Sequence, residues 1–98
     1  MGRPAEALHR ARRRADRREG ARAWVGLGAA DLNAGRSGSA VVRLTTALEQ
    51  TRPLDDNWLV AMGLGLLGLV HHGQGRHDDA LACFTTARAH AETNGRPA

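Results

Sequence analysis

Apolar and small residues recur three, four and seven positions apart in two segments of the chain, which is the spacing of one face of an α-helix. The positions are Trp24, Leu27, Gly28 and Asp31 in the first segment, and Leu64, Leu67, Gly68 and His71 in the second. A glycine, Gly35 or Gly75, follows each segment. A second helical pattern then begins, with Ala40, Leu44 and Ala47 after the first glycine and Ala80, Phe84 and Ala87 after the second. The pattern predicts two helical hairpins.

The two hairpins are copies of one unit, because many residues return after a spacing of 40. Among those that return unchanged are Leu27, Gly28, Gly35, Arg36, Ala40, Thr45, Thr46 and Ala47, as Leu67, Gly68, Gly75, Arg76, Ala80, Thr85, Thr86 and Ala87. A period of this size indicates a solenoid, in which each unit is stabilised by its neighbours. Such stacks usually bind other molecules and do not transform them.

The small residues of the repeat predict where helices approach each other and where they end. Gly28 and Gly68 have no side chain, so we expect the partner helix to pack closely there. Gly35 and Gly75 are expected to end the first helix of each hairpin in a left-handed conformation, which glycine adopts without steric cost.

The register also extends toward the N-terminus. Ala7, Leu8 and Arg12 precede Ala47, Leu48 and Arg52 by the same spacing. Residues 5–19 are therefore expected to form the second helix of a preceding unit, either as part of a longer array or as a cap. The prediction is one domain, residues 1–98, of about five helices: a half repeat at 5–19 and full repeats at 21–52 and 57–94.

This arrangement resembles the tetratricopeptide repeat, with its Trp-x-x-Leu-Gly-x-x-Tyr, Ala-x-x-x-Phe and Pro positions. The first unit matches with Trp24, Leu27, Gly28, Ala40 and Pro53, and the second with Leu67, Gly68, Ala80 and Phe84. Departures from the pattern are Leu44 for the phenylalanine, Leu64 for the tryptophan, and Asp31 and His71 for the tyrosine. The long units are similar to the repeat arrays of large bacterial signal-transducing ATPase regulators.

The resemblance covers residues 21 to 94 and implies an all-α, short right-handed solenoid that binds a protein or peptide and has a regulatory role. The ligand would lie on the concave face formed by the first helix of each pair. Candidate residues there are Arg22, Val25, Ala29, Leu32 and Asn33 in the first unit, and Met62, Gly65, Leu69, His72 and Gly73 in the second. Of these, Arg22, Asn33 and His72 carry groups that hydrogen-bond a peptide backbone or carboxylate.

Charge is distributed unevenly along the chain. All 14 basic residues are arginines; eight of them lie within residues 1–22 beside three acids, which gives that segment a net charge of +5 and the remainder −1. An arginine-rich helix is able to neutralise phosphates, so the alternative function is that of a nucleic-acid-associated transcriptional regulator. The segment has no interleaved aromatic residues and no helix-turn-helix companion. A solvated or protein-facing helix is therefore favoured over nucleic-acid contact.

Other chemistry finds little support in the sequence. Gly63, Gly65 and Gly68 spell a dinucleotide-binding motif but lack the βαβ context that it requires. The histidines and Cys83 match no zinc spacing, so no metal and no cofactor are expected, and no catalytic group of residues is found. We expect a non-enzymatic protein, with Cys83 as a packed thiol.

Location and assembly follow from two further features. The longest run without charge or histidine, Asn57 to Val70, is too short to span a bilayer, and Met1 to Glu6 begin no signal peptide, so a cytoplasmic protein is expected. The apolar residues Leu81, Phe84 and Ala87 of the last helix have no following repeat to cover them, which predicts self-association or a bound partner.

Overall fold

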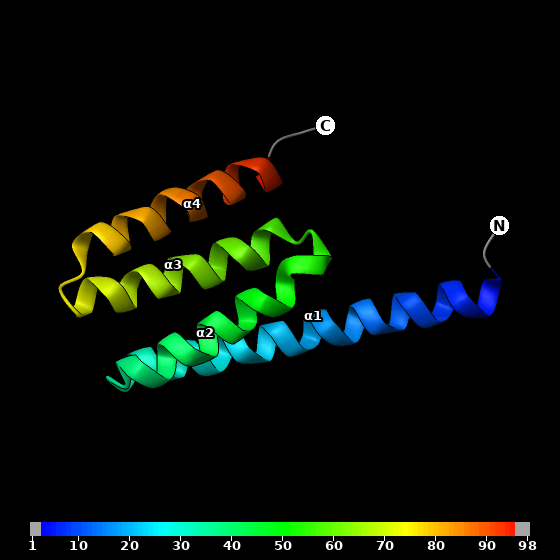
Figure 1. Ribbon diagram of the computed structural model, residues 1–98, viewed down its shortest axis with the longest axis horizontal. Helices are drawn as coiled ribbons and strands as arrows, with labels where there is room; N and C mark the ends of the chain where they lie inside the picture. The colour runs from blue at the N-terminus through cyan, green and yellow to red at the C-terminus, as the bar shows by residue number, and fades with distance from the viewer. Residues whose placement is uncertain (1–2, 96–98) are drawn as a thin grey trace.

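The computed structural model describes residues 3–95, and that part of the chain is all-α with no strands (Figure 1). The elements in chain order are α1 (Pro4–Asn33), α2 (Ser37–Thr51), the 3-10 turn η1 (Arg52–Leu54), α3 (Asn57–Gly73) and α4 (His77–Gly95). The helices α1 and α2 form one antiparallel hairpin, and α3 and α4 form the second. The prediction of a short all-α solenoid of helical hairpins is confirmed.

The two hairpin turns have the same geometry. Gly35 and Gly75 have φ values of 77° and 78°, in the left-handed region where a Cβ would be strained. The Arg36 amide donates to the Asp31 carbonyl at 2.8 Å, and the Arg76 amide donates to the His71 carbonyl at 2.9 Å. The predicted role of both glycines is thereby confirmed.

The first helix differs from the prediction. Residues 5–19 do not form a separate helix, because α1 is continuous over 30 residues and contains both the expected half repeat and the first helix of the repeat at 21–52. Gly20 is the only weak helix former near the expected boundary, and a lone glycine costs only about 1 kcal/mol in a helix interior. The described residues therefore contain four α-helices and not about five.

The close helix contacts lie where the glycines predict them. A Cβ built on Gly28 would lie 2.6 Å from both Cγ and Cδ2 of Leu44, and one built on Gly68 would lie 2.6 Å from Cε1 of Phe84. Since real Cβ atoms do not approach so closely, any other residue at these two positions would force the partner side chain to shift.

Two small clusters make up the core. Ala21 and Val25 of α1 meet Ala47 of α2 and Leu59 of α3 in the first, and Ala40 and Leu44 pack with Val70 in the second. Both clusters join the two hairpins, as expected for a solenoid. The face of α1 predicted from Trp24, Leu27, Gly28 and Asp31 is not wholly buried, however, because Leu27 is 44% exposed.

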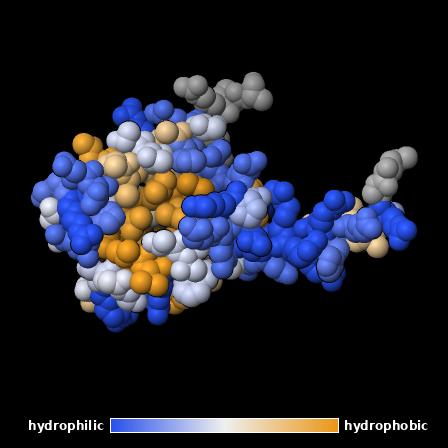
Figure 2. Space-filling model, in the orientation of Figure 1, coloured by the Kyte–Doolittle hydropathy of each residue, from blue (hydrophilic) through white to orange (hydrophobic). Residues whose placement is uncertain are grey.

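The N-terminal part of α1 projects from this body as an arm, residues 4–17, in which every residue is exposed. The arm makes the molecule long, with extents of 52 × 30 × 15 Å (Figure 1). Figure 2 shows hydrophobic residues gathered over the body and hydrophilic residues along the arm. None of the helices described here is long and apolar enough to cross a membrane.

Candidate functional site

A groove of about 440 Å³ runs between α1 and α3, the first helices of the two hairpins. Its lining residues are Arg22, Val25, Gly26 and Ala29 from α1, and Trp58, Leu59, Met62 and Leu66 from α3. The helical periodicity explains this set, because the residues from α1 are spaced three and four apart and so face one direction. The volume falls within the range of about 300–1,000 Å³ that is typical of ligand sites.

The groove has a buried floor and an exposed rim. Val25 and Leu59 are 6% and 3% exposed and belong to the core, whereas Trp58 and Met62 are 57% and 43% exposed. Arg22 is the only charged residue among those that line the groove. The surface therefore offers apolar contact area with one cation at its edge.

Four of the candidate residues lie together in this groove: Arg22, Val25, Ala29 and Met62. One of them, Val25, was expected on the concave surface but is largely a core residue, because α1 packs against both α2 and α3.

The other candidates do not line the groove. Among them are Asn33 and Gly73, the last residues of α1 and α3, and Leu69, which is exposed elsewhere on α3. The ring of His72 instead makes an edge-to-face contact with the His77 ring, with centroids 5.4 Å apart. Leu32 and Gly65 are also absent from the lining.

Sequence reasoning missed Gly26, Trp58, Leu59 and Leu66 as groove residues. The repeat register held a signal for one pair, because Gly26 and Leu66 are 40 residues apart and occupy the same position on their two helices. Trp58 lies in the first turn of α3, where the helical pattern is too short to fix a direction.

The arm presents an arginine stripe, which we define as Arg10, Arg13, Arg14 and Arg17. These residues are spaced three and four apart and face Pro53 and Leu54 across a shallow cleft of about 310 Å³. Arg14 donates to the Leu54 carbonyl at 3.2 Å, and the neighbouring Arg18 forms an ion pair with Asp56 at 3.1 Å. These two contacts fasten the base of the arm to the connection between α2 and α3.

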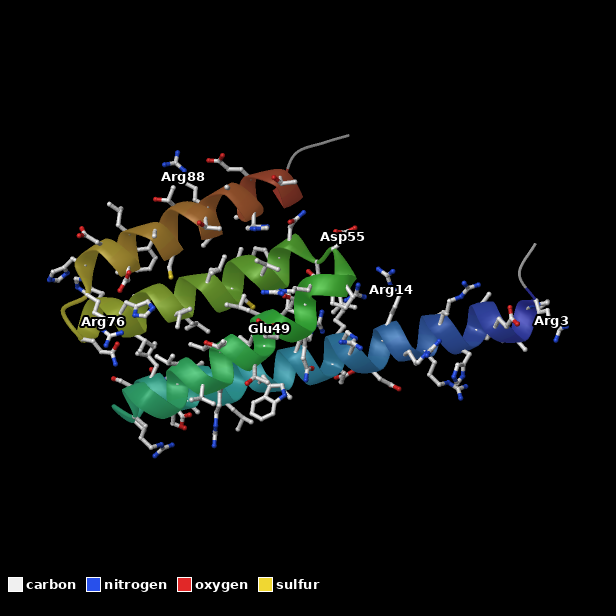
Figure 3. All side chains as sticks on the ribbon, viewed as in Figure 1. Arg3, Arg14, Glu49, Asp55, Arg76 and Arg88 are labelled. Atoms are coloured by element: carbon white, nitrogen blue, oxygen red, sulfur yellow. The ribbon has the colours of Figure 1, made fainter. Side chains whose placement is uncertain are left out.

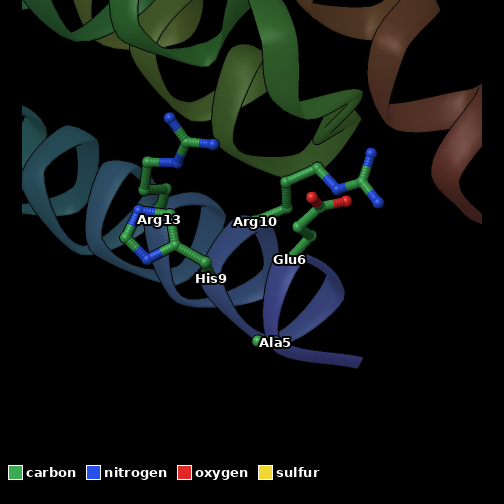
Figure 4. A pocket seen from close by; sticks show the side chains of 5 residues that line it. All are labelled: Ala5, Glu6, His9, Arg10 and Arg13. Carbon is green, nitrogen blue, oxygen red and sulfur yellow. The ribbon is translucent and has the colours of Figure 1, made fainter. Parts of the chain in front are cut away.

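Farther out, the arm offers no enclosed site. Figure 4 shows the surface formed by Ala5, Glu6, His9, Arg10 and Arg13, all of which come from α1. Because no second element lines this surface, a ligand there would remain open to water on most sides.

Comparison with known proteins places these features in a family. A family model for the tetratricopeptide repeat matches residues 19–93, which include both hairpins. The chain belongs to the tetratricopeptide repeat family. No curated protein and no solved structure matches it. Repeats of this family typically act as protein-interaction modules. The groove lies between the first helices of the two repeats.

The first tetratricopeptide unit holds a buried charge where the family pattern has tyrosine. Asp31 is 1% exposed; its Oδ2 accepts a hydrogen bond from Ser39 at 2.7 Å, and ion pairs reach it from Arg36 at 3.0 Å and Arg43 at 3.3 Å. The Ser39 hydrogen bond lowers the pKa of Asp31, burial opposes that shift, and the two guanidinium groups lower the pKa further. The cluster joins α1 to α2 and is not part of the groove lining.

The second unit has different residues at most of the positions that correspond to the Asp31 cluster. His71 takes the place of Asp31, and its buried Nδ1 has no hydrogen-bond partner in the described part of the chain. Burial, with a smaller effect from the charge of Asp79, raises the pKa of the half-buried Cys83 thiol. Among the described residues no group of three or more His, Cys, Asp or Glu side chains is arranged to hold a metal ion.

Proposed function

We propose that this tetratricopeptide repeat protein binds an extended peptide segment of a partner protein in the groove between α1 and α3. The observation that carries the proposal is the groove itself, in which exposed Trp58 and Met62 stand over a floor of core residues. Family membership supports the same role, because these repeats serve as interaction modules and typically not as catalysts.

The lining defines the chemistry of the peptide. An aromatic or long aliphatic side chain would bury apolar area against Trp58, Met62 and Leu66, at about 25 cal/mol per Å². A carboxylate next to that side chain would pair with Arg22, whose guanidinium binds carboxylates in a two-pronged geometry. The preferred segment therefore combines an apolar anchor with an acidic neighbour.

Tryptophan fluorescence provides the test. Random peptides displayed on phage are selected against the whole chain, and the best is titrated into a Trp24→Phe background, so that only Trp58 emits. Trp58 is more than half exposed, so a bound peptide should shift its emission.

Two variants of α3 decide whether the groove is used. Met62→Glu places a charge inside it, whereas Leu69→Glu makes the same kind of change at a similarly exposed position outside it. We expect binding to be lost in the first variant and kept in the second. Equal binding by both, or no selected peptide, would refute the proposal.

A second candidate function is contact with nucleic acid, and the observation in its favour is the fully exposed arm with its arginine stripe. The arm has no aromatic side chain to stack on bases and no adjacent helix, so we expect no submicromolar binding to duplex DNA at physiological salt. Anisotropy of a labelled duplex tests this. Tight binding that Arg12→Gln, Arg13→Gln and Arg14→Gln together abolish would establish this second function instead.

A cytoplasmic location and a place in a bacterial regulatory protein are the finer parts of the proposal. The long unit of 40 residues supports the regulatory context through its likeness to regulator arrays, and the single cysteine is consistent with a reducing compartment. Cell fractionation with an antibody to the chain tests the location; recovery in the membrane or secreted fraction would contradict it.

A further inference from the structure

The packing of the first repeat on the second provides a template for a contact between two separate copies of the chain. In this contact, helix α2 packs on helix α3. Leu48 lies over Gly63, with its Cδ2 3.1 Å from the place of a Cβ, while Ala47 clusters with Leu59. Leu44 packs in the same way with Val70.

The corresponding positions in the outer helices are found by moving 40 residues along the chain. From α2 the shift leads to Phe84, Ala87 and Arg88 on α4, and from α3 it leads to Glu19, Ala23 and Ala30 on α1. We call the first set the α4 face and the second the α1 face. All of these residues are exposed except Ala87, which is half-buried.

Both faces carry apolar surface that no described element covers. Phe84 of the α4 face is 37% exposed and the neighbouring Leu81 is 65% exposed, while Leu27, beside the α1 face, is 44% exposed. Arg88 points away from α3 (Figure 3), and its side chain is 82% exposed.

We propose that the α4 face of one copy of this chain docks on the α1 face of a second copy and repeats the packing of α2 on α3. Arg88 would then take the place of Leu48, and Glu19 would take the place of Leu59. In the template these two positions are neighbours, since Leu48 lies on Gly63 one helical turn from Leu59. At this contact the guanidinium group of Arg88, which also pairs with Glu92 on its own helix at 2.9 Å, would face the carboxylate of Glu19.

The geometry of the contact sets its strength and symmetry. The contact is heterologous, because two different faces meet. After each added copy, the assembly still has one free α1 face at one end and one free α4 face at the other. The arm points away from the other helices (Figure 1), and the three residues of the α1 face are exposed. Because alanines make up most of that face, we expect an interface below about 1,200 Å² and weak, concentration-dependent association. This inference does not depend on the peptide groove.

Charge exchange tests the proposal by sedimentation velocity of the whole chain from micromolar to millimolar concentration. The wild-type chain should associate progressively. Arg88→Glu and Glu19→Arg, each alone, should weaken association at least about tenfold, because like charges then meet at every junction. An equimolar mixture of the two variants should associate like the wild type, because every junction between unlike copies again joins opposite charges.

Controls separate this pairing from a general effect of net charge. Arg76→Glu and Glu49→Arg make the same charge changes at exposed positions outside both faces (Figure 3), and should leave association unchanged. Circular dichroism checks that each variant is folded. A monomeric wild type at millimolar concentration, a mixture that does not associate, or controls that weaken association equally would each overturn the proposal.

Discussion

Replacement of Gly28 by alanine should destabilise the protein because the new methyl group has no room. The added Cβ would lie 2.6 Å from Cγ and Cδ2 of Leu44. Leu44 is 0% exposed, and its Cγ is the branch point of the side chain, so it has little freedom to move away. Overpacking of this kind typically costs about 1–3 kcal/mol.

Gly26→Ala is the matched control. Gly26 lies two residues earlier in α1, and a Cβ there would have nothing within 4 Å. Both substitutions gain the same intrinsic helix preference of alanine over glycine, about 1 kcal/mol, so this gain cancels in their difference. We therefore expect Gly28→Ala to be less stable than Gly26→Ala by about 1–3 kcal/mol.

The assay is urea unfolding followed by far-ultraviolet circular dichroism, with a check that the dependence on urea is the same in both variants. The second repeat offers a graded comparison. Gly68→Ala should cost less than Gly28→Ala, because Phe84 is 37% exposed and its ring is able to swing outward, whereas the larger Gly68→Leu should cost about 1–3 kcal/mol or more. Equal stability of Gly28→Ala and Gly26→Ala would refute the close contact and the repeat register with it.

Three further predictions concern single groups. The lowered pKa of Asp31 means that its ionised form stabilises the fold above the usual carboxyl pKa, and that this stability is lost as the pH falls through the folded-state pKa. The difference in free energy of unfolding between wild type and Asp31→Asn should therefore narrow below about pH 4. A constant difference in urea unfolding would contradict this. Gly75→Ala should lower stability by about 1–2 kcal/mol because φ is 78°, and a thermal melt at the wild-type temperature would exclude that strain. The raised pKa of Cys83 should make its alkylation by iodoacetamide at neutral pH slower than that of free cysteine, and an equal rate would show that the thiol is not shielded.

The repeat register made the hairpin geometry predictable from the sequence. The left-handed turns at Gly35 and Gly75 and the close contacts at Gly28 and Gly68 depend on residues whose physical role is local or set by one partner helix. A spacing of 40 shows such positions twice, so each copy supports the interpretation of the other.

The continuity of α1 was harder to predict from the sequence. The repeat register assigns residues 5–19 to the second helix of one unit and residues 21–33 to the first helix of the next. Only the absence of a turn signal around Gly20 indicated the outcome. A repeat comparison gives the equivalence of positions but not the way in which the chain connects them.

The candidate site was predictable only in part, since a solenoid helix packs on more than one neighbour. Val25 is not on the face of α1 predicted from Trp24, Leu27 and Gly28, but it packs with Ala47 of α2 and Leu59 of α3. The buried charge of Asp31 was hidden for a similar reason, as Ser39 and Arg43 approach it from α2. The sequence of one helix does not show which side chains a neighbouring helix packs against it.

The most direct test of the peptide-binding account is a nuclear magnetic resonance titration of the labelled chain with the peptide that phage selection yields. The account predicts that the largest shifts fall on the indole N–H of Trp58 and the backbone amide of Gly26, on opposite walls of the groove. Shifts confined to the arginine stripe of the arm or to the outer side of α4, with Trp58 and Gly26 unchanged, would contradict it.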